Sequence, residues 1–159
     1  MDLTRLTPVS RMAGEDPTDT ALLRDLLDRA EGYLRSFQWC ERIEEAYFGV
    51  GVGGIVAVFL FRIRPTKPDV DEWLWVISGD LPPAYLVTDN APNPASALQV
   101  YVELMGEWVD AVIGGRAVDD LIPVNVPPTA EWATNLQGRL KFLREEILSR
   151  HEEDLRACN

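Results

Sequence analysis

Seven consecutive apolar residues, IVAVFLF at 55–61, constrain this chain more than any other stretch of its sequence. Most of them are β-branched or aromatic, which favours a strand over a helix. The run is far shorter than the roughly 20 residues that a membrane-spanning helix needs. An apolar run of this kind is typical of a strand at the centre of a sheet. The sequence therefore predicts a central strand over residues 55–63.

The residues just before this run, GVGVGG at 49–54, have the G-x-G-x-x-G spacing of a dinucleotide-binding turn. Such a turn needs a helix directly after the glycines, because the N-terminus of that helix holds the pyrophosphate. The β-type residues that follow argue against a helix, and Pro65 and Pro68 leave little room for one. We interpret the stretch as the bend of a hairpin and predict no cofactor.

Three further segments, residues 43–50, 72–78 and 84–88, are also β-type. The links between the strands are short and rich in turn residues, such as Gly79, Asp80 and Pro82. Consecutive strands with short links favour an antiparallel meander, here of about four strands.

Helices are predicted on both sides of the strands in the sequence. Asp16-Pro17 and Asn93-Pro94 each combine a capping residue with a proline at the first helical position, and Thr129 is a third cap. They predict helices over residues 17–37, 94–113 and 130–151.

The order α-β-β-β-β-α-α predicts the α+β class, with three helices packed on one face of the sheet. Residues 16–151 are expected to form a single domain, between an N-terminal tail or arm (1–15) and a C-terminal tail (152–159).

The chain is strongly acidic, with 26 acidic and 15 basic residues and a net charge of −11. Residues 65–120 hold ten carboxylates but only Lys67 and Arg116 as basic residues, so this segment carries a charge of −8. Such a charge repels nucleic acid and attracts a basic protein. A merely solvated acidic surface is the alternative interpretation.

The residues of metal and nucleophile chemistry are scarce. Two cysteines, Cys40 and Cys158, and one histidine, His151, do not make a zinc site or a supported catalytic site. We therefore predict no metal, no cofactor and no catalytic residue. Without a disulfide framework or an apolar leader, the expected location is the cytoplasm, with no membrane contact.

The candidate ligand or acid–base residues are five carboxylates of the acidic segment: Asp69, Asp71, Glu72, Asp80 and Asp89. Alternation along an extended chain places the first two on one side, where their oxygens could bind Mg²⁺ or Ca²⁺. Asp80 and Asp89 lie in turns that flank the fourth strand, and we expect both to border the same edge of the sheet. The alternative is that these residues only guard a strand end and cap turns.

The chain has five tryptophans, at positions 39, 73, 75, 108 and 132, and most of them are expected in the core. Trp73 and Trp75 are two positions apart on a strand, so they share a face. If Leu74 and Val76 face the helices, the two tryptophans lie on the uncovered face beside the acidic residues 69–72. They would then form an interaction surface or line a ligand groove.

Three hypotheses of function follow. The first is a non-catalytic protein-binding module, either an adaptor or an immunity-type inhibitor of a basic partner. The second is a small ligand-binding domain or enzyme that uses the acidic turn residues. The third is a structural subunit whose homodimer buries Trp73 and Trp75.

Overall fold

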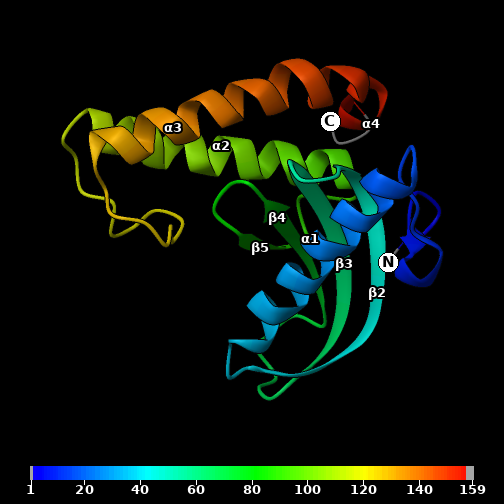
Figure 1. Ribbon diagram of the computed structural model, residues 1–159. Coiled ribbons are helices and arrows are strands. Elements are labelled where there is room, and N and C mark those ends of the chain that lie inside the picture. The colour runs from blue at the N-terminus through cyan, green and yellow to red at the C-terminus, as the bar shows by residue number, and fades with distance from the viewer. Residues whose placement is uncertain (1, 157–159) are drawn as a thin grey trace.

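The computed structural model describes residues 2–156 and has an α+β fold built around a five-stranded antiparallel sheet (Figure 1). The strands are β1 (Thr7–Pro8), β2 (Cys40–Val52), β3 (Val56–Pro65), β4 (Trp73–Gly79) and β5 (Ala84–Val87), and their order in the sheet is their order in the chain. Helix α1 (Pro17–Arg35) precedes β2, and α2 (Pro94–Ile113) and α3 (Ala130–Phe142) follow β5. The predicted antiparallel meander is confirmed.

Each of the main helices begins at the residue that its capping sequence predicts. The Asp16 side chain accepts a hydrogen bond from the Asp19 amide, and Thr129 accepts one from the Trp132 amide. Asn93 and Ser96 form a reciprocal capping box at the start of α2. After Phe142 the helical path continues through a π-helical turn (Leu143–Ile147), a 3₁₀ turn (Leu148–Arg150) and α4 (Glu152–Arg156).

Strand β3 is the central strand and is buried on both faces. Val58 and Leu60 face a core formed with α2 and α3, whereas Phe59 and Phe61 face a second core formed with α1. The prediction that all helices pack on one face is therefore wrong. A strand that is apolar on both sides needs a cover on both sides, and α1 supplies the second one.

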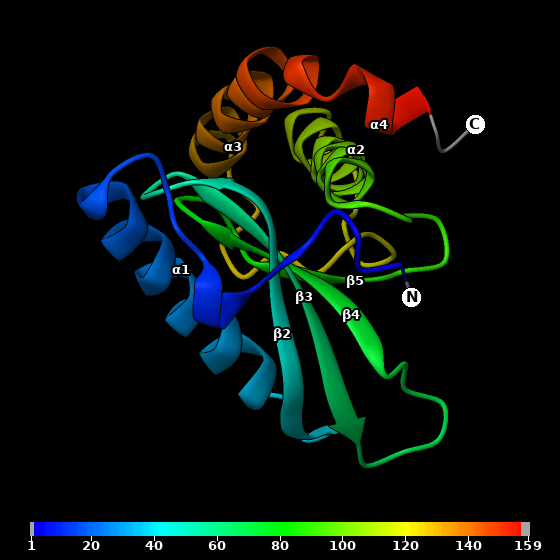
Figure 2. The ribbon, with the colours of Figure 1, turned by 90° about the vertical axis from the view of Figure 1, so that its right-hand side faces the viewer.

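The helices thus form separate layers. Helix α1 lies along the sheet, while α2 and α3 run side by side as another layer (Figures 1 and 2). Helix α2 buries Tyr101, Met105 and Trp108 between the sheet and α3, which is why it is apolar around most of its circumference.

The glycine-rich stretch is a hairpin bend, as predicted. Strand β2 runs to Val52, β3 starts at Val56, and these two residues are paired across the bend. Gly54 has a φ of +78°, a conformation that glycine adopts without strain. Because a strand follows the glycines, no helix N-terminus is present here to hold a pyrophosphate.

The N-terminal arm adds a strand that the sequence pattern does not reveal. Thr7 pairs with Phe48 and Pro8 with Tyr47, which makes β1 a short edge strand beside β2. Arg5 forms an ion pair with Asp154 at 2.6 Å, so the arm also contacts α4.

Candidate functional site

The two strand tryptophans lie in different environments. Trp75 is 0% exposed in the core beneath α2, and its indole N–H donates a hydrogen bond to the Ala91 carbonyl at 2.8 Å. Trp73 is half-buried at the margin of that core, with its ring centroid 6.3 Å from that of Tyr47. The prediction of an uncovered tryptophan face is wrong for Trp75, because α2 covers that side of β4. A homodimer interface cannot use Trp75 for the same reason.

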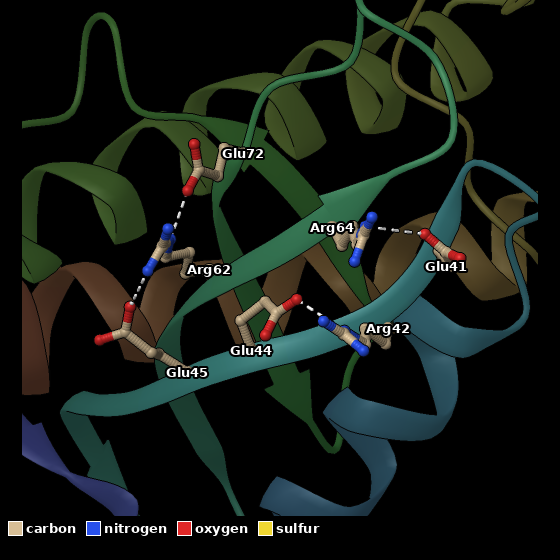
Figure 3. A network of polar contacts seen from close by, with 7 residues as sticks. All are labelled: Glu41, Arg42, Glu44, Glu45, Arg62, Arg64 and Glu72. Atoms are coloured by element: carbon tan, nitrogen blue, oxygen red, sulfur yellow. Dashed lines mark hydrogen bonds and ion pairs between the residues drawn. The ribbon is translucent and has the colours of Figure 1, made fainter.

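Glu72 belongs to a network of ion pairs on β2 and β3 (Figure 3). Arg62 on β3 lies between Glu72, which precedes β4, and Glu45 on β2, which is 2.7 Å away. Hydrogen bonds from Tyr47 and Arg62 hold the pKa of Glu45 below its ordinary value. The neighbouring pairs are Arg64–Glu41 and Arg42–Glu44. Glu72 therefore helps to join the strands and is not grouped with the other candidate carboxylates.

The other candidate carboxylates do not gather in one place. Asp69 and Asp71 are exposed in the β3–β4 link, and Asp89 is exposed just after β5. Asp80 precedes β5, whereas Asp89 follows it, so the two carboxylates lie at opposite ends of that strand. The two turns thus flank one edge strand but not one end of it. Asp80 is the candidate carboxylate that lines a pocket, so the ligand-binding hypothesis now depends on one carboxylate and not on a cluster of them.

Asp80 lies in a groove between α3 and the β4–β5 turn, which we call the α3 groove. One pocket of the groove, of about 340 Å³, is lined by Pro82, Trp132 and Leu136 among others. A second pocket, of about 280 Å³, is lined by Ile55, Gly138 and Phe142. Asp80, Leu81, Asn135 and Arg139 line both pockets and therefore lie where the two meet.

The β4–β5 turn is held in place by hydrogen bonds to two other elements. The Asp80 amide donates to the Ile55 carbonyl at 2.9 Å, which ties the turn to the start of β3. Arg139 of α3 donates from Nε to the Asp80 carbonyl and from Nη2 to Asp80 Oδ2, the latter at 2.9 Å. Gly79 allows the turn to pack this closely against β3, because a Cβ at this position would lie 2.1 Å from the Ile55 oxygen. The wall of the groove is therefore preorganised.

Two large apolar side chains of α3 are exposed along this groove. Trp132 is 46% exposed and Phe142 is 39% exposed, whereas Leu136 and Leu140 of the same helix are buried against α2. Trp132 is therefore an exception to the expectation that most of the tryptophans lie in the core. Its signal in the sequence is a second helical stripe, in which Trp132, Asn135, Arg139 and Phe142 recur at helical spacing.

A second hollow adjoins the α3 groove. It has a volume of about 510 Å³ and is lined by Tyr33, Phe37, Trp108 and the loop at 118–128. Tyr33 and Phe37 form an aromatic cluster with Trp39 and Tyr85, in which the Phe37 and Trp39 rings stack at 4.7 Å. Burial raises the pKa of Tyr33 to about 12. This cluster covers the side of the edge strand β5 that faces α1, and the sequence analysis did not identify it.

Among residues 2–156, the remaining sequence candidates show no further site. Cys40 is a buried thiol whose pKa is raised by burial, and Cys158 lies outside the described residues. Within residues 2–156, no three His, Cys, Asp or Glu side chains are placed together so that they could hold a metal ion. None of the described helices is both long enough and apolar enough to cross a membrane.

Comparison with known proteins gives no relative for this fold and groove. No protein-family model matches the sequence, and no curated protein or solved structure matches it.

Proposed function

We propose that this protein is a non-catalytic protein-binding module with a basic protein as its partner. The observation that carries the proposal is uncompensated negative charge between residues 65 and 120. Of the ten carboxylates there, only Glu72 and Asp80 have an ion-pair partner among the described residues. Unpaired carboxylates give the surface a negative potential, which attracts the lysines and arginines of a partner.

Three of these carboxylates form a stripe on α2. Glu103, Glu107 and Asp110 are exposed at a spacing that places them on one side of the helix. They line a hollow of about 310 Å³ between α2 and the π-helical turn, and Arg144 is the basic residue that lines it with them. We refer to these three carboxylates as the α2 acidic stripe.

An adaptor and an immunity-type inhibitor of a basic effector both fit this proposal. Each needs an acidic face on a stable scaffold, since complementary charge speeds association and selects the partner. A cytoplasmic location is part of the proposal, and its support is the sparse cysteine content.

The proposal is tested with two charge variants that each make the net charge less negative by the same amount. The first is Glu103→Gln, Glu107→Gln and Asp110→Asn, which removes the α2 acidic stripe. The control is Asp25→Asn, Glu146→Gln and Glu152→Gln, whose carboxylates are exposed but paired with arginines one helical turn away. The wild type is immobilised, and the proteins that it retains from a cell lysate are identified at about 0.01 M and about 0.15 M salt, two concentrations at which salt screens surface charges to very different extents.

We expect the wild type to retain a basic protein, with tighter binding at the lower salt. The purified partner should bind the stripe variant roughly tenfold more weakly, as expected for three modest charge interactions, and the control variant almost as well as the wild type. If no basic protein is retained at either salt, or if both variants weaken binding equally, the proposal is wrong.

A further inference from the structure

We infer that the α3 groove is the docking site for an amphipathic basic helix of the partner. This inference rests on the proposed function and adds to the α2 acidic stripe a second contact surface and the kind of segment that binds there. A groove beside an exposed aromatic stripe is the surface into which amphipathic helices insert their apolar side chains.

The separation of Trp132 and Phe142, which line one pocket each, defines the length of partner helix that fits the groove. Trp132 and Phe142 are ten positions apart on α3, which corresponds to about 15 Å along the helix axis. A helix that lies along α3 would present apolar side chains at the same separation, ten or eleven positions apart. Exposed tryptophan at a preformed pocket is typical of the residues that contribute most to binding energy.

Gly138 leaves the groove side of α3 open to a close approach. It lies inside α3, where glycine destabilises the helix relative to alanine. A Cβ at this position would meet no atom within 4 Å, so packing within the chain does not require a glycine. Gly138 lines the pocket of Phe142, and the missing side chain leaves room for a close approach by another backbone.

The charges around the groove favour a basic partner over a second copy of this chain. Arg139 compensates Asp80 inside the groove, which leaves the floor apolar and locally neutral. The neighbouring hollow contains Asp119, Glu131 lies beside Trp132, and Lys141 lies beside Phe142. None of the three has an ion-pair partner in the part of the chain that the structure describes, so the negative charge lies toward the Trp132 end of the groove. A second copy would bring another net charge of −11, and the two copies would repel each other.

The test uses three synthetic helical peptides of roughly 18 residues, long enough to cover both pockets. The first contains leucine, lysine and alanine, with two leucines eleven positions apart on its apolar face. The second has the same composition in scrambled order, and the third has glutamate in place of lysine. Each peptide is titrated into the full-length protein, with the Trp132 indole and the Phe142 amide followed by nuclear magnetic resonance.

Four variants locate the binding surface. Trp132→Ala removes the exposed aromatic side chain, and Gly138→Leu fills the pocket beside Phe142. Ile113→Ala and Gly32→Leu are the matched controls, since Ile113 is exposed at the end of α2 and a Cβ at Gly32 of α1 also meets no atom within 4 Å. Circular dichroism establishes that each variant is folded before its affinity is compared.

We expect the amphipathic basic peptide to shift the Trp132 and Phe142 signals and to bind at least about tenfold more tightly than the other two peptides. Trp132→Ala should weaken it roughly 30-fold, and Gly138→Leu roughly tenfold, while both controls bind like the wild type. The inference is overturned if the scrambled peptide binds equally well, if the shifts map to the α2 acidic stripe and not to the groove, or if no peptide binds. It is also overturned if the groove mediates self-association that Trp132→Ala abolishes.

These outcomes are separate from those of the proposed function. A captured basic protein that binds the Trp132→Ala and Gly138→Leu variants with wild-type affinity would leave the proposed function standing and remove the groove from it. A peptide that binds the groove, without any basic protein captured by the wild type, would contradict the proposed function instead.

Discussion

Replacing Gly79 with alanine tests whether the β4–β5 turn is held as tightly as the structure shows. Gly79 has a φ of +156°, and its α-carbon lies against the start of β3. An alanine Cβ would lie 2.1 Å from the Ile55 oxygen, although real Cβ contacts are essentially never closer than 3.0 Å. The turn must therefore move away from β3.

The expected cost follows from what this movement disrupts. The hydrogen bond from the Asp80 amide to Ile55 contributes about 1 kcal/mol net, and a non-glycine residue in a strained conformation costs about 1–3 kcal/mol. We expect the free energy of unfolding to fall by about 2–4 kcal/mol. For a chain of this size, that corresponds to a Tm lower by roughly 5–15 °C.

The assay is urea and thermal unfolding followed by circular dichroism, with Gly106→Ala as the control. Gly106 lies inside α2, and an added Cβ there would meet no atom within 4 Å. The control should therefore stabilise the protein by about 0.5–1 kcal/mol, because alanine favours the helix. If Gly79→Ala unfolds at the wild-type midpoint, the turn is not packed against β3 and the preorganised wall of the α3 groove does not exist.

Three further predictions concern the core, the aromatic cluster and the ion pair of the groove. Trp75→Phe should lower the free energy of unfolding by about 2–4 kcal/mol in urea, because it removes buried volume and leaves a buried carbonyl without its donor; the same change at Trp73 should cost less than about 1 kcal/mol. The pKa of Tyr33 is raised from 10.0 to about 12, so the free energy of unfolding should fall as the pH rises from 10 to 12, because there the unfolded chain has lost the Tyr33 proton and the folded chain keeps it. Urea titrations at alkaline pH should show a smaller fall with pH for Tyr33→Phe. A double-mutant cycle of Asp80→Asn and Arg139→Gln should give a coupling of about 0.2–1 kcal/mol that weakens in high salt, since both side chains are well exposed; zero coupling at low salt would mean that the pair does not form in solution.

Local sequence rules predicted the elements of this fold well. Caps at Asp16, Asn93 and Thr129 each mark a helix start, because a side chain that bonds the first amides acts over three residues. The hairpin at Gly54 was predicted from the β-type residues that follow the glycines. Strand β1 was missed, because a strand of two residues has no periodicity of its own and exists only through its pairing with β2.

The candidate site was predicted only in part. Asp80 was identified, because a carboxylate in a tight turn is recognisable from turn chemistry. The sequence left open whether Trp73 and Trp75 are covered, and it did not reveal that Trp132 is exposed. Alternation showed that Trp73 and Trp75 share a face but not which face a helix covers. For Trp132, the sequence does not show how far along α3 the contact with α2 extends.

The sequence by itself determined the three main helices, four of the five strands, their order, the hairpin and the acidic character of the chain, because these depend on residues close together or on simple counts. The tertiary structure alone decided that helices cover both faces of the sheet. It also decided that Trp75 is buried while Trp132 is exposed, and that Arg139 meets Asp80 across the α3 groove. The last pair is separated by 59 positions in the chain. Contacts at such distances depend on how the layers pack together, and no local pattern encodes that packing.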